Sequence, residues 1–218
     1  MRLLAVGDSF TYGEELADRN FAWPYLLGKK LNSEITNLGK PGAGNTKILR
    51  NTVEHASDYD IVIVAWSHFA RIEMADEHGI YDIWPGSTGN LFKDELTYRR
   101  DLLNYINRHH DDLYLYSQQL IRVILLQNYL KQTNKKYIML DAFTECYDPT
   151  SPREKMRLLV PQLANQIDPM YYLGWPNETM MEWTYRTPQG PDGHFLEQGH
   201  QRVADKIYEH IRYLGWVS

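Results

Sequence analysis

The chain has little of several features that mark common protein classes. It contains a single cysteine, Cys146, which excludes an internal disulfide and a zinc site built from cysteines. Its net charge of -5 argues against binding to nucleic acid through phosphate contacts. No apolar run approaches the ~18 residues that cross a bilayer, and the amino terminus lacks the pattern of a signal peptide. These absences predict a cytoplasmic protein without nucleic-acid or membrane partners.

A glycine-rich segment lacks the ending that would make it a phosphate-binding loop. Gly39-Lys40-Pro41-Gly42-Ala43-Gly44-Asn45 follows a short apolar run and can expose backbone N–H groups to a ligand. It has no Gly-Lys-Ser/Thr ending, so it does not predict a P-loop. An ordinary flexible turn is the alternative interpretation. The sequence thus predicts no cofactor and no metal.

Apolar strand patterns alternate with helical patterns along the chain. Such alternation is typical of a parallel, doubly wound sheet with right-handed crossovers. The length of 218 residues is most simply one domain, 1–218. On the longest helix, which ends near residue 131, Leu120, Ile121, Ile124 and Leu125 are predicted to face the core. The predicted strands are 3–6, 34–38, 61–65, 137–141 and 170–173, and further helices are predicted at 23–31, at 46–56 and after His194.

Between the third strand and this long helix, residues 69–112 are polar and aromatic, with loop signals at Pro85-Gly86-Ser87. We interpret them as an insertion over the edge of the sheet, followed by the start of the helix. Aromatic residues are also prominent here and near the carboxyl end. They favour either a stacking surface for a sugar ring or ordinary packing of core and lid. The residues concerned are Trp66, Trp84, Trp175, Trp183 and Tyr185.

Two short motifs at opposite ends of the chain carry chemistry. Gly7-Asp8-Ser9 follows the first apolar strand, which places the Ser9 hydroxyl at the carboxyl edge of the sheet, where ligands bind in open α/β folds. The alternative role for Ser9 is to cap the next helix. Asp192-Gly193-His194 lies in a loop just before the closing helix, whose apolar residues recur at helical spacing.

Together these residues resemble the SGNH (GDSL-type) hydrolase family. Its first block is similar to Gly7-Asp8-Ser9-Phe10, its second to Asn37-Leu38-Gly39-Lys40-Pro41-Gly42, and its last to Asp192-Gly193-His194. The resemblance implies a flavodoxin-like, three-layer α/β/α fold with a doubly wound parallel five-stranded sheet. The chain departs from the family in two places. The acid precedes the histidine by two residues instead of three, and Ala65-Trp66-Ser67-His68 stands where the family has an asparagine.

The resemblance also implies a role for each matching residue. Ser9 would attack the ester carbonyl, His194 would act as base and then as acid, and Asp192 would orient the imidazole. The backbone N–H groups of Ser9 and Gly42 would bind the oxyanion. Three side chains could replace the missing asparagine as a further oxyanion donor, namely Asn45, Ser67 and His68.

The implied function is that of a serine esterase or deacetylase acting on a small-molecule or carbohydrate ester. An acyltransferase would use the same residues. A module that binds carbohydrate and has lost its activity is the alternative from another class, because the family's asparagine is missing. The pattern leaves the oligomeric state open.

Overall fold

The computed structural model describes residues 1–77, 79–84, 104, 108, 111–143 and 157–217. Among these residues, no helix combines the length and apolar character that a bilayer-spanning helix requires. The strands are β1 (Arg2–Val6), β2 (Glu34–Asn37), β3 (Ile61–Trp66), β4 (Ile72–Asp76), β5 (Gly79–Ile83) and β6 (Lys136–Asp141). The helices are α1 (Ser9–Tyr12), α2 (Trp23–Leu31), α3 (Asn45–His55), α5 (Asp112–Gln132), α7 (Pro161–Ala164), α8 (Met180–Trp183) and α9 (Glu197–Tyr213), with 3-10 turns at Arg19–Phe21 and Ala56–Asp58.

Four strands form a parallel sheet in the order β2-β1-β3-β6. The sequence predicts a fifth strand at 170–173, and this segment does lie beside β6. Its pairing is limited to a bridge between Met139 and Tyr172, in which the Met139 N–H donates to Tyr171 and the Leu173 N–H donates to Met139, both at 2.8 Å. The predicted fifth strand is therefore a single bridge at the edge of the sheet.

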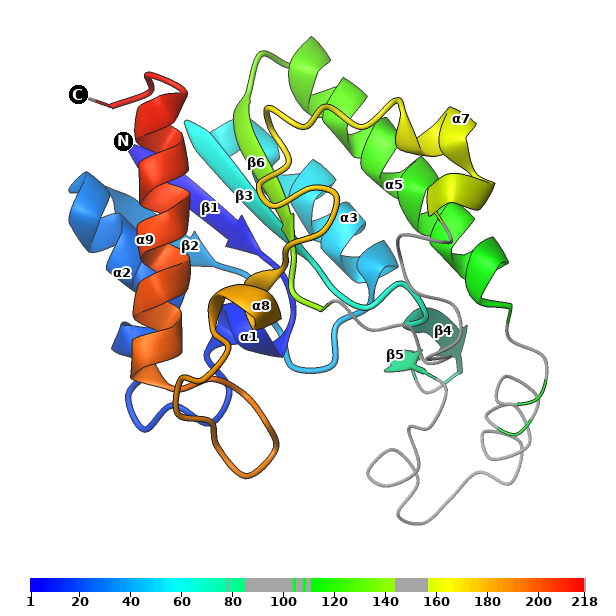
Figure 1. Cartoon of the computed structure of the whole chain (residues 1–218), viewed down its shortest axis with the longest axis horizontal. Coiled ribbons are helices and arrows are strands. Elements are labelled where there is room, and N and C mark those ends of the chain that lie inside the picture. The colour runs from blue at the N-terminus through cyan, green and yellow to red at the C-terminus, as the bar shows by residue number, and fades with distance from the viewer. Residues whose placement is uncertain (78, 85–103, 105–107, 109–110, 144–156, 218) are drawn as a thin grey trace.

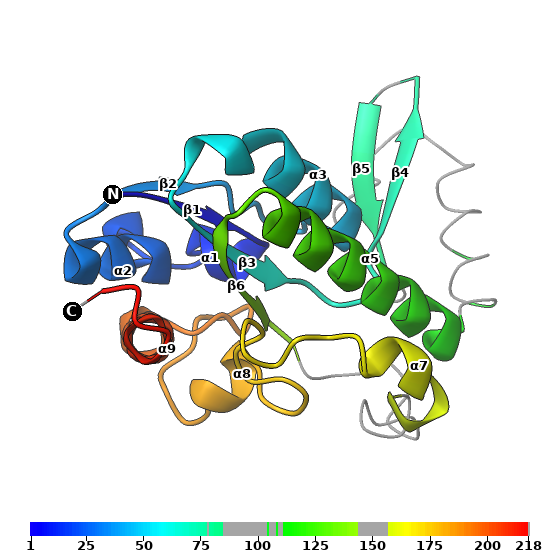
Figure 2. The same ribbon diagram turned by 90° about the horizontal axis from the view of Figure 1, so that it is seen from above.

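Helices cover both faces of the sheet, which gives three layers (Figures 1 and 2). Successive side chains of a strand point to opposite faces. Accordingly, Leu4 and Val6 of β1 pack with α3 and α5, whereas Leu3 and Ala5 pack with α2 and α9. Strand β3 is buried along its whole length, as expected for a central parallel strand. The predicted α/β/α architecture is confirmed.

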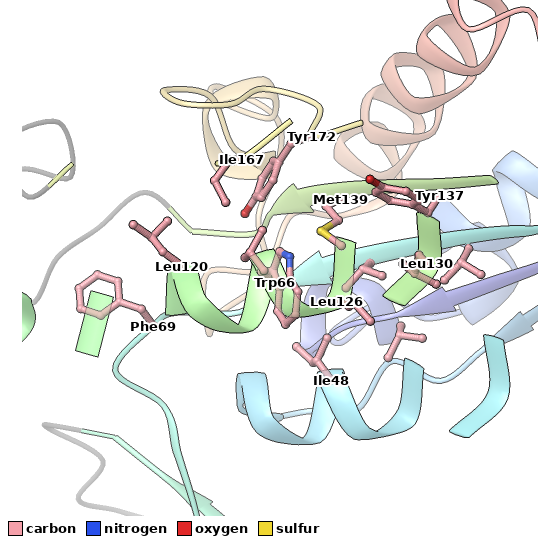
Figure 3. Close-up of a cluster of buried hydrophobic side chains, with 14 of the residues drawn as sticks. Ile48, Trp66, Phe69, Leu120, Leu126, Leu130, Tyr137, Met139, Ile167 and Tyr172 are labelled. Carbon is pink, nitrogen blue, oxygen red and sulfur yellow. The ribbon is translucent and has the colours of Figure 1, made fainter. Parts of the chain in front are cut away.

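Between the sheet and α3 and α5 lies the larger of the two clusters of buried hydrophobic side chains (Figure 3). Leu120 faces this cluster as predicted, but Ile121 is 37% exposed and Leu125 is 60% exposed. Helix α5 is apolar on more than one face, so the sequence alone did not identify the buried one. Its buried apolar residues recur at helical spacing: Tyr116, Leu120, Val123, Leu126 and Leu130.

On the other face, His200 joins α9 to α2. Its ring is buried, and its Nδ1 accepts a hydrogen bond from the Trp23 backbone N–H at 3.2 Å. Burial lowers the pKa of His200 to about 3, so the imidazole is neutral at physiological pH. His200 is thus a packing residue of the closing helix.

The order of the strands places a topological switch point between β1 and β3. The connection from β1 leads to β2 on one side, and the next strand, β3, lies on the other side of β1. In open α/β sheets, ligands bind at the carboxyl ends of the strands at such a point. Ser9 follows β1 and Ser67 follows β3, so both lie there.

Part of the predicted insertion is an antiparallel hairpin, β4–β5, packed against α3. Arg50 of α3 forms a two-bond ion pair with Glu73 at 2.6 and 2.8 Å, and Lys47 pairs with Asp82. Residues 78, 85–103, 105–107 and 109–110 of the predicted insertion lie outside the described residues.

Candidate active site

The serine turn is held by its own aspartate. Asp8 caps α1, because its Oδ1 accepts a hydrogen bond from the Phe10 N–H at 3.1 Å. Ser9 is the first residue of the helix and is almost fully buried. N–H groups in the first turn of a helix have no intrahelical acceptor, and the Ser9 N–H bonds to no other described residue. The turn therefore offers a backbone donor beside the hydroxyl.

A glutamate from the segment after α1 binds the histidine. The Glu15 carboxylate accepts hydrogen bonds from the Asp192 N–H at 2.9 Å, the His194 N–H at 3.0 Å and the His194 Nδ1 at 2.9 Å. The Phe10 ring lies 4.9 Å from the imidazole, centroid to centroid, which places the histidine beside the serine turn. The side chains of His194 and Glu15 are 16% and 11% exposed, so solvent screens this pair only partly.

The environment of Glu15 keeps its carboxyl group ionised. The Asp192 N–H lowers its pKa most, and the His194 backbone and imidazole lower it further. An ionised carboxylate only accepts hydrogen bonds, so the His194 Nδ1 must carry a proton. In the neutral imidazole this leaves Nε2 as the acceptor. Glu15 also has a φ of 64°, a left-handed conformation that costs a non-glycine residue about 1–2 kcal/mol.

Asp192 does not occupy the position that the sequence predicts. Asp192 is exposed at the tip of its loop, and it contacts Glu15 through its backbone N–H. Asp141, another acid at this edge, accepts a hydrogen bond from the Tyr172 hydroxyl at 2.7 Å. The sequence predicts that Asp192 binds the His194 imidazole, whereas in the structure the carboxylate of Glu15 does so.

The glycine-rich loop after β2 lies against the serine turn. The Lys40 N–H donates to the Gly7 carbonyl at 3.1 Å, and Asn37 Nδ2 donates to the Thr11 carbonyl at 2.8 Å. Like that of Ser9, the N–H of Gly42 bonds to no other described residue. The loop that carries Gly42 thus packs against the turn that carries Ser9.

Asn45 is a candidate oxyanion donor, but its side-chain amide is hydrogen-bonded to the backbone after β3. It is completely buried, and its Nδ2 donates to the carbonyls of Ser67 at 3.0 Å and His68 at 3.4 Å. Its Oδ1 accepts from the Ser67 N–H at 2.8 Å. Both amide protons are therefore directed at the backbone after β3. The geometry makes Asn45 a brace between α3 and β3 and leaves no proton for an oxyanion.

We expect Asn45→Ala to lower the free energy of unfolding by about 2–4 kcal/mol, because each buried polar group left unpaired costs about 1–3 kcal/mol. The measurement is a urea titration of the intact chain. Asn51→Ala is the matched control, since it makes the same change on the same helix at a side chain that hydrogen-bonds to no described residue. Equal stability of the two variants would contradict the bracing role.

Two further candidate donors follow β3. Ser67 is 5% exposed. Burial raises the pKa of Asp8, and the Arg71 charge and the Ser67 hydroxyl partly oppose this rise. His68 accepts a hydrogen bond from the Ala70 N–H on its Nδ1 at 3.1 Å. A neutral His68 therefore carries its proton on Nε2, which is the tautomer that can donate from that atom.

Arg71, which belongs to none of the sequence motifs, lies against the serine turn and the glycine-rich loop. Its Nη1 is 3.5 Å from Asp8 Oδ2 and 3.4 Å from the Ala43 carbonyl oxygen. Its guanidinium carbon lies 5.1 Å from the Trp84 ring centroid and 5.0 Å from that of Phe143. Of the aromatic residues proposed as a sugar-stacking surface, Trp84 packs on Arg71. Trp66 and Trp183 are buried, Trp175 is half-buried against Tyr172, and Tyr185 is 68% exposed.

Local patterns do not identify Glu15 or Arg71. The His194 N–H that Glu15 binds is 179 positions away in the sequence, and neither residue belongs to a motif. For Glu15, the signal is its left-handed backbone conformation, which only the structure reveals.

A family model described as "Family of unknown function (DUF6071)" matches residues 11–218. No curated protein sequence matches the chain.

Solved structures similar to this one include several G-D-S-L proteins and esterases. A mutant of an acetyl-xylooligosaccharide esterase from Geobacillus Stearmophilus has a TM-score of 0.57 at 16% identity, covering 96% of this chain and 93% of its own. TesA has a TM-score of 0.57 at 15% identity, with 98% and 99% covered. A putative lipolytic G-D-S-L protein from Desulfitobacterium hafniense has 0.53 at 12%, with 96% and 98% covered. The resemblance to SGNH hydrolases is thereby confirmed in the fold.

Proposed function

The chain belongs to the DUF6071 family, whose function is unknown, and we propose that it is a serine hydrolase that cleaves a small acyl ester. Ser9 is the nucleophile, His194 the base and Glu15 the acid that orients the base. The observation that carries the proposal is the hydrogen bond from His194 Nδ1 to Glu15, beside the turn that presents Ser9.

The first half of the reaction forms an acyl-enzyme. Ser9 Oγ attacks the carbonyl carbon while its proton passes to His194 Nε2, and the carbonyl electron pair becomes an oxyanion. The N–H groups of Ser9 and Gly42 donate to this oxyanion. When the carbonyl re-forms, the bond to the alcohol breaks, and the alcohol leaves with the proton from Nε2.

The second half repeats these steps with water. His194 removes a proton from the water as it attacks the acyl carbon, and then returns one to Ser9 Oγ as the ester bond breaks. Throughout, Glu15 accepts from Nδ1 and stabilises the imidazolium that forms. In this structure no hydrogen bond joins the Ser9 hydroxyl to His194, both of which are described, and such bonds often form only when substrate is bound.

The substrate class that we propose is an acetyl or similarly short acyl ester, carried by a small alcohol or a sugar. Support comes from the similar structures, one of which is described as an acetyl-xylooligosaccharide esterase. The half-buried Trp84 ring lies 3.9 Å from the place that a Cβ on Gly42 would occupy, so an aromatic surface borders the proposed oxyanion donors.

Labelling with a fluorophosphonate tests the proposal. We expect the folded chain to be modified once, at Ser9, and His194→Ala to slow the labelling at least a hundredfold, because the hydroxyl then lacks its base. The modified peptide is identified by mass spectrometry. Ser117→Ala, which removes a hydroxyl near the start of α5, is the control and should label at the wild-type rate. A folded chain that resists the reagent would support a binding module instead of an enzyme.

A further inference from the structure

Arg71 brings a positive charge between the serine turn and the glycine-rich loop, which carry the two proposed oxyanion donors. Its Nη1 approaches Asp8, the residue before Ser9, and the carbonyl of Ala43, the residue after Gly42, at 3.5 and 3.4 Å. The side chain is 12% exposed, so water screens its charge weakly. The guanidinium therefore bridges the serine turn and the glycine-rich loop.

Aromatic rings hold the guanidinium in place. The rings of Trp84 and Phe143 lie 5.1 and 5.0 Å from its central carbon, within the range of cation–π attraction. Phe143 in turn packs edge-on against Phe10, 5.1 Å away, in the serine turn. A planar guanidinium carries its N–H donors around its edge, so these contacts hold the donors in a defined orientation.

Several of these donors are unused. The Nε of Arg71 is buried and makes no hydrogen bond, and within the described part of the chain Nη2 makes none either. A buried donor without an acceptor costs free energy, so it persists where something else repays the cost. An oxyanion that appears only during the reaction would be such an acceptor.

Building on the serine hydrolase proposed above, we infer that Arg71 is the third oxyanion donor and replaces the asparagine that this chain lacks after β3. Ser67 stands at that position with a short side chain, and the Asn45 amide is committed to the backbone. The Asp8 carboxylate, which faces Nη1, positions the guanidinium. A charge-assisted N–H donor is stronger than a neutral amide, so Arg71 compensates for the lost side chain.

The test compares three variants with the wild-type chain on 4-nitrophenyl acetate, a neutral ester: Arg71→Gln, Asp8→Asn and the double variant. We expect Arg71→Gln to lower kcat about 10²–10³-fold, the usual effect of removing one oxyanion donor, with little change in KM. The double variant removes both charges, so it leaves no buried charge unpaired, and its kcat should remain low. Recovery of the double variant to the kcat of Asp8→Asn would mean that Arg71 only neutralises Asp8, and would overturn the inference.

The inhibition constant of a boronic acid distinguishes an oxyanion donor from a structural residue. The boronic acid forms a tetrahedral anion on the serine, so its binding depends on the donors that contact this anion. Arg71→Gln should weaken this inhibitor by the same factor as kcat/KM, while Arg50→Gln, which removes the arginine of the ion pair between α3 and β4, should change neither. Unchanged kcat of Arg71→Gln on the neutral ester would refute the inference. Fluorophosphonate labelling separates the two proposals: a wild-type chain unlabelled at Ser9 refutes the hydrolase, whereas a labelled chain with unaffected Arg71→Gln refutes only the donor role.

Discussion

Glu15→Gln is expected to lower kcat by about 10³–10⁴-fold while leaving the fold intact, by analogy with loss of the acid from other Ser-His-acid triads. Glutamine has nearly the same size, but it replaces one carboxylate oxygen with an NH₂ group. All three of the groups that Glu15 binds are donors. An amide NH₂ next to Nδ1 favours the tautomer whose proton is on Nε2, and that imidazole cannot accept the Ser9 proton. The measurement is kcat on 4-nitrophenyl acetate, with circular dichroism to verify folding.

Asp192→Asn is the matched control, because it makes the same chemical change two residues before His194. The Asp192 side chain is exposed, and its backbone N–H, which binds Glu15, is retained in the variant. We expect its kcat to stay within about threefold of the wild type, a difference of less than 1 kcal/mol. A large loss of kcat in Asp192→Asn and none in Glu15→Gln would contradict the role of Glu15 and would identify Asp192 as the acid, as the SGNH motif predicts.

The elements that position the site could be predicted because their signals are local. Residues 61–64 form a continuous β-branched run, and this run is the buried centre of the sheet. Ser9 and His194 could be selected for a similar reason, since each lies in a short motif next to a strand or a helix. The rule that places ligands at the carboxyl ends of parallel strands then brings such motifs together without any knowledge of side-chain contacts.

The proposed acid, Glu15, and the proposed third donor, Arg71, could not be predicted because their contacts are tertiary. Nothing around Glu15 indicates that its backbone is left-handed or that its carboxylate meets a loop from the other end of the chain. Asn45 has the right chemistry for an oxyanion donor, but its neighbours after β3 use both of its protons. Likewise, the burial of one face of α5 is decided by the sheet, so Leu125 is exposed although it is apolar.

Gly190→Ala is expected to disable the same acid from the opposite side of the contact. A Cβ on Gly190 would lie 2.4 to 2.8 Å from the three carboxylate atoms of Glu15, closer than such atoms approach each other. The carboxylate is held by three hydrogen bonds and cannot move aside without losing some of them. We therefore expect kcat to fall about 10²–10³-fold, approaching the effect of Glu15→Gln. The chain should otherwise stay folded, since φ of Gly190 lies outside the left-handed region.

Gly193→Ala supplies the control from the same loop. At Gly193 a Cβ has space but the backbone is left-handed, whereas at Gly190 the backbone is ordinary but a Cβ has no space. A Cβ on Gly193 would meet nothing within 4 Å, but its φ of 84° is left-handed. Alanine at 193 should therefore cost about 1–2 kcal/mol of folding free energy, measured by urea unfolding, with a much smaller loss of kcat than Gly190→Ala. If Gly190→Ala retained wild-type kcat, the position of the Glu15 carboxylate would not matter for catalysis. If both variants lost activity equally, the decisive factor would be the conformation of the loop instead of the contact between Gly190 and Glu15.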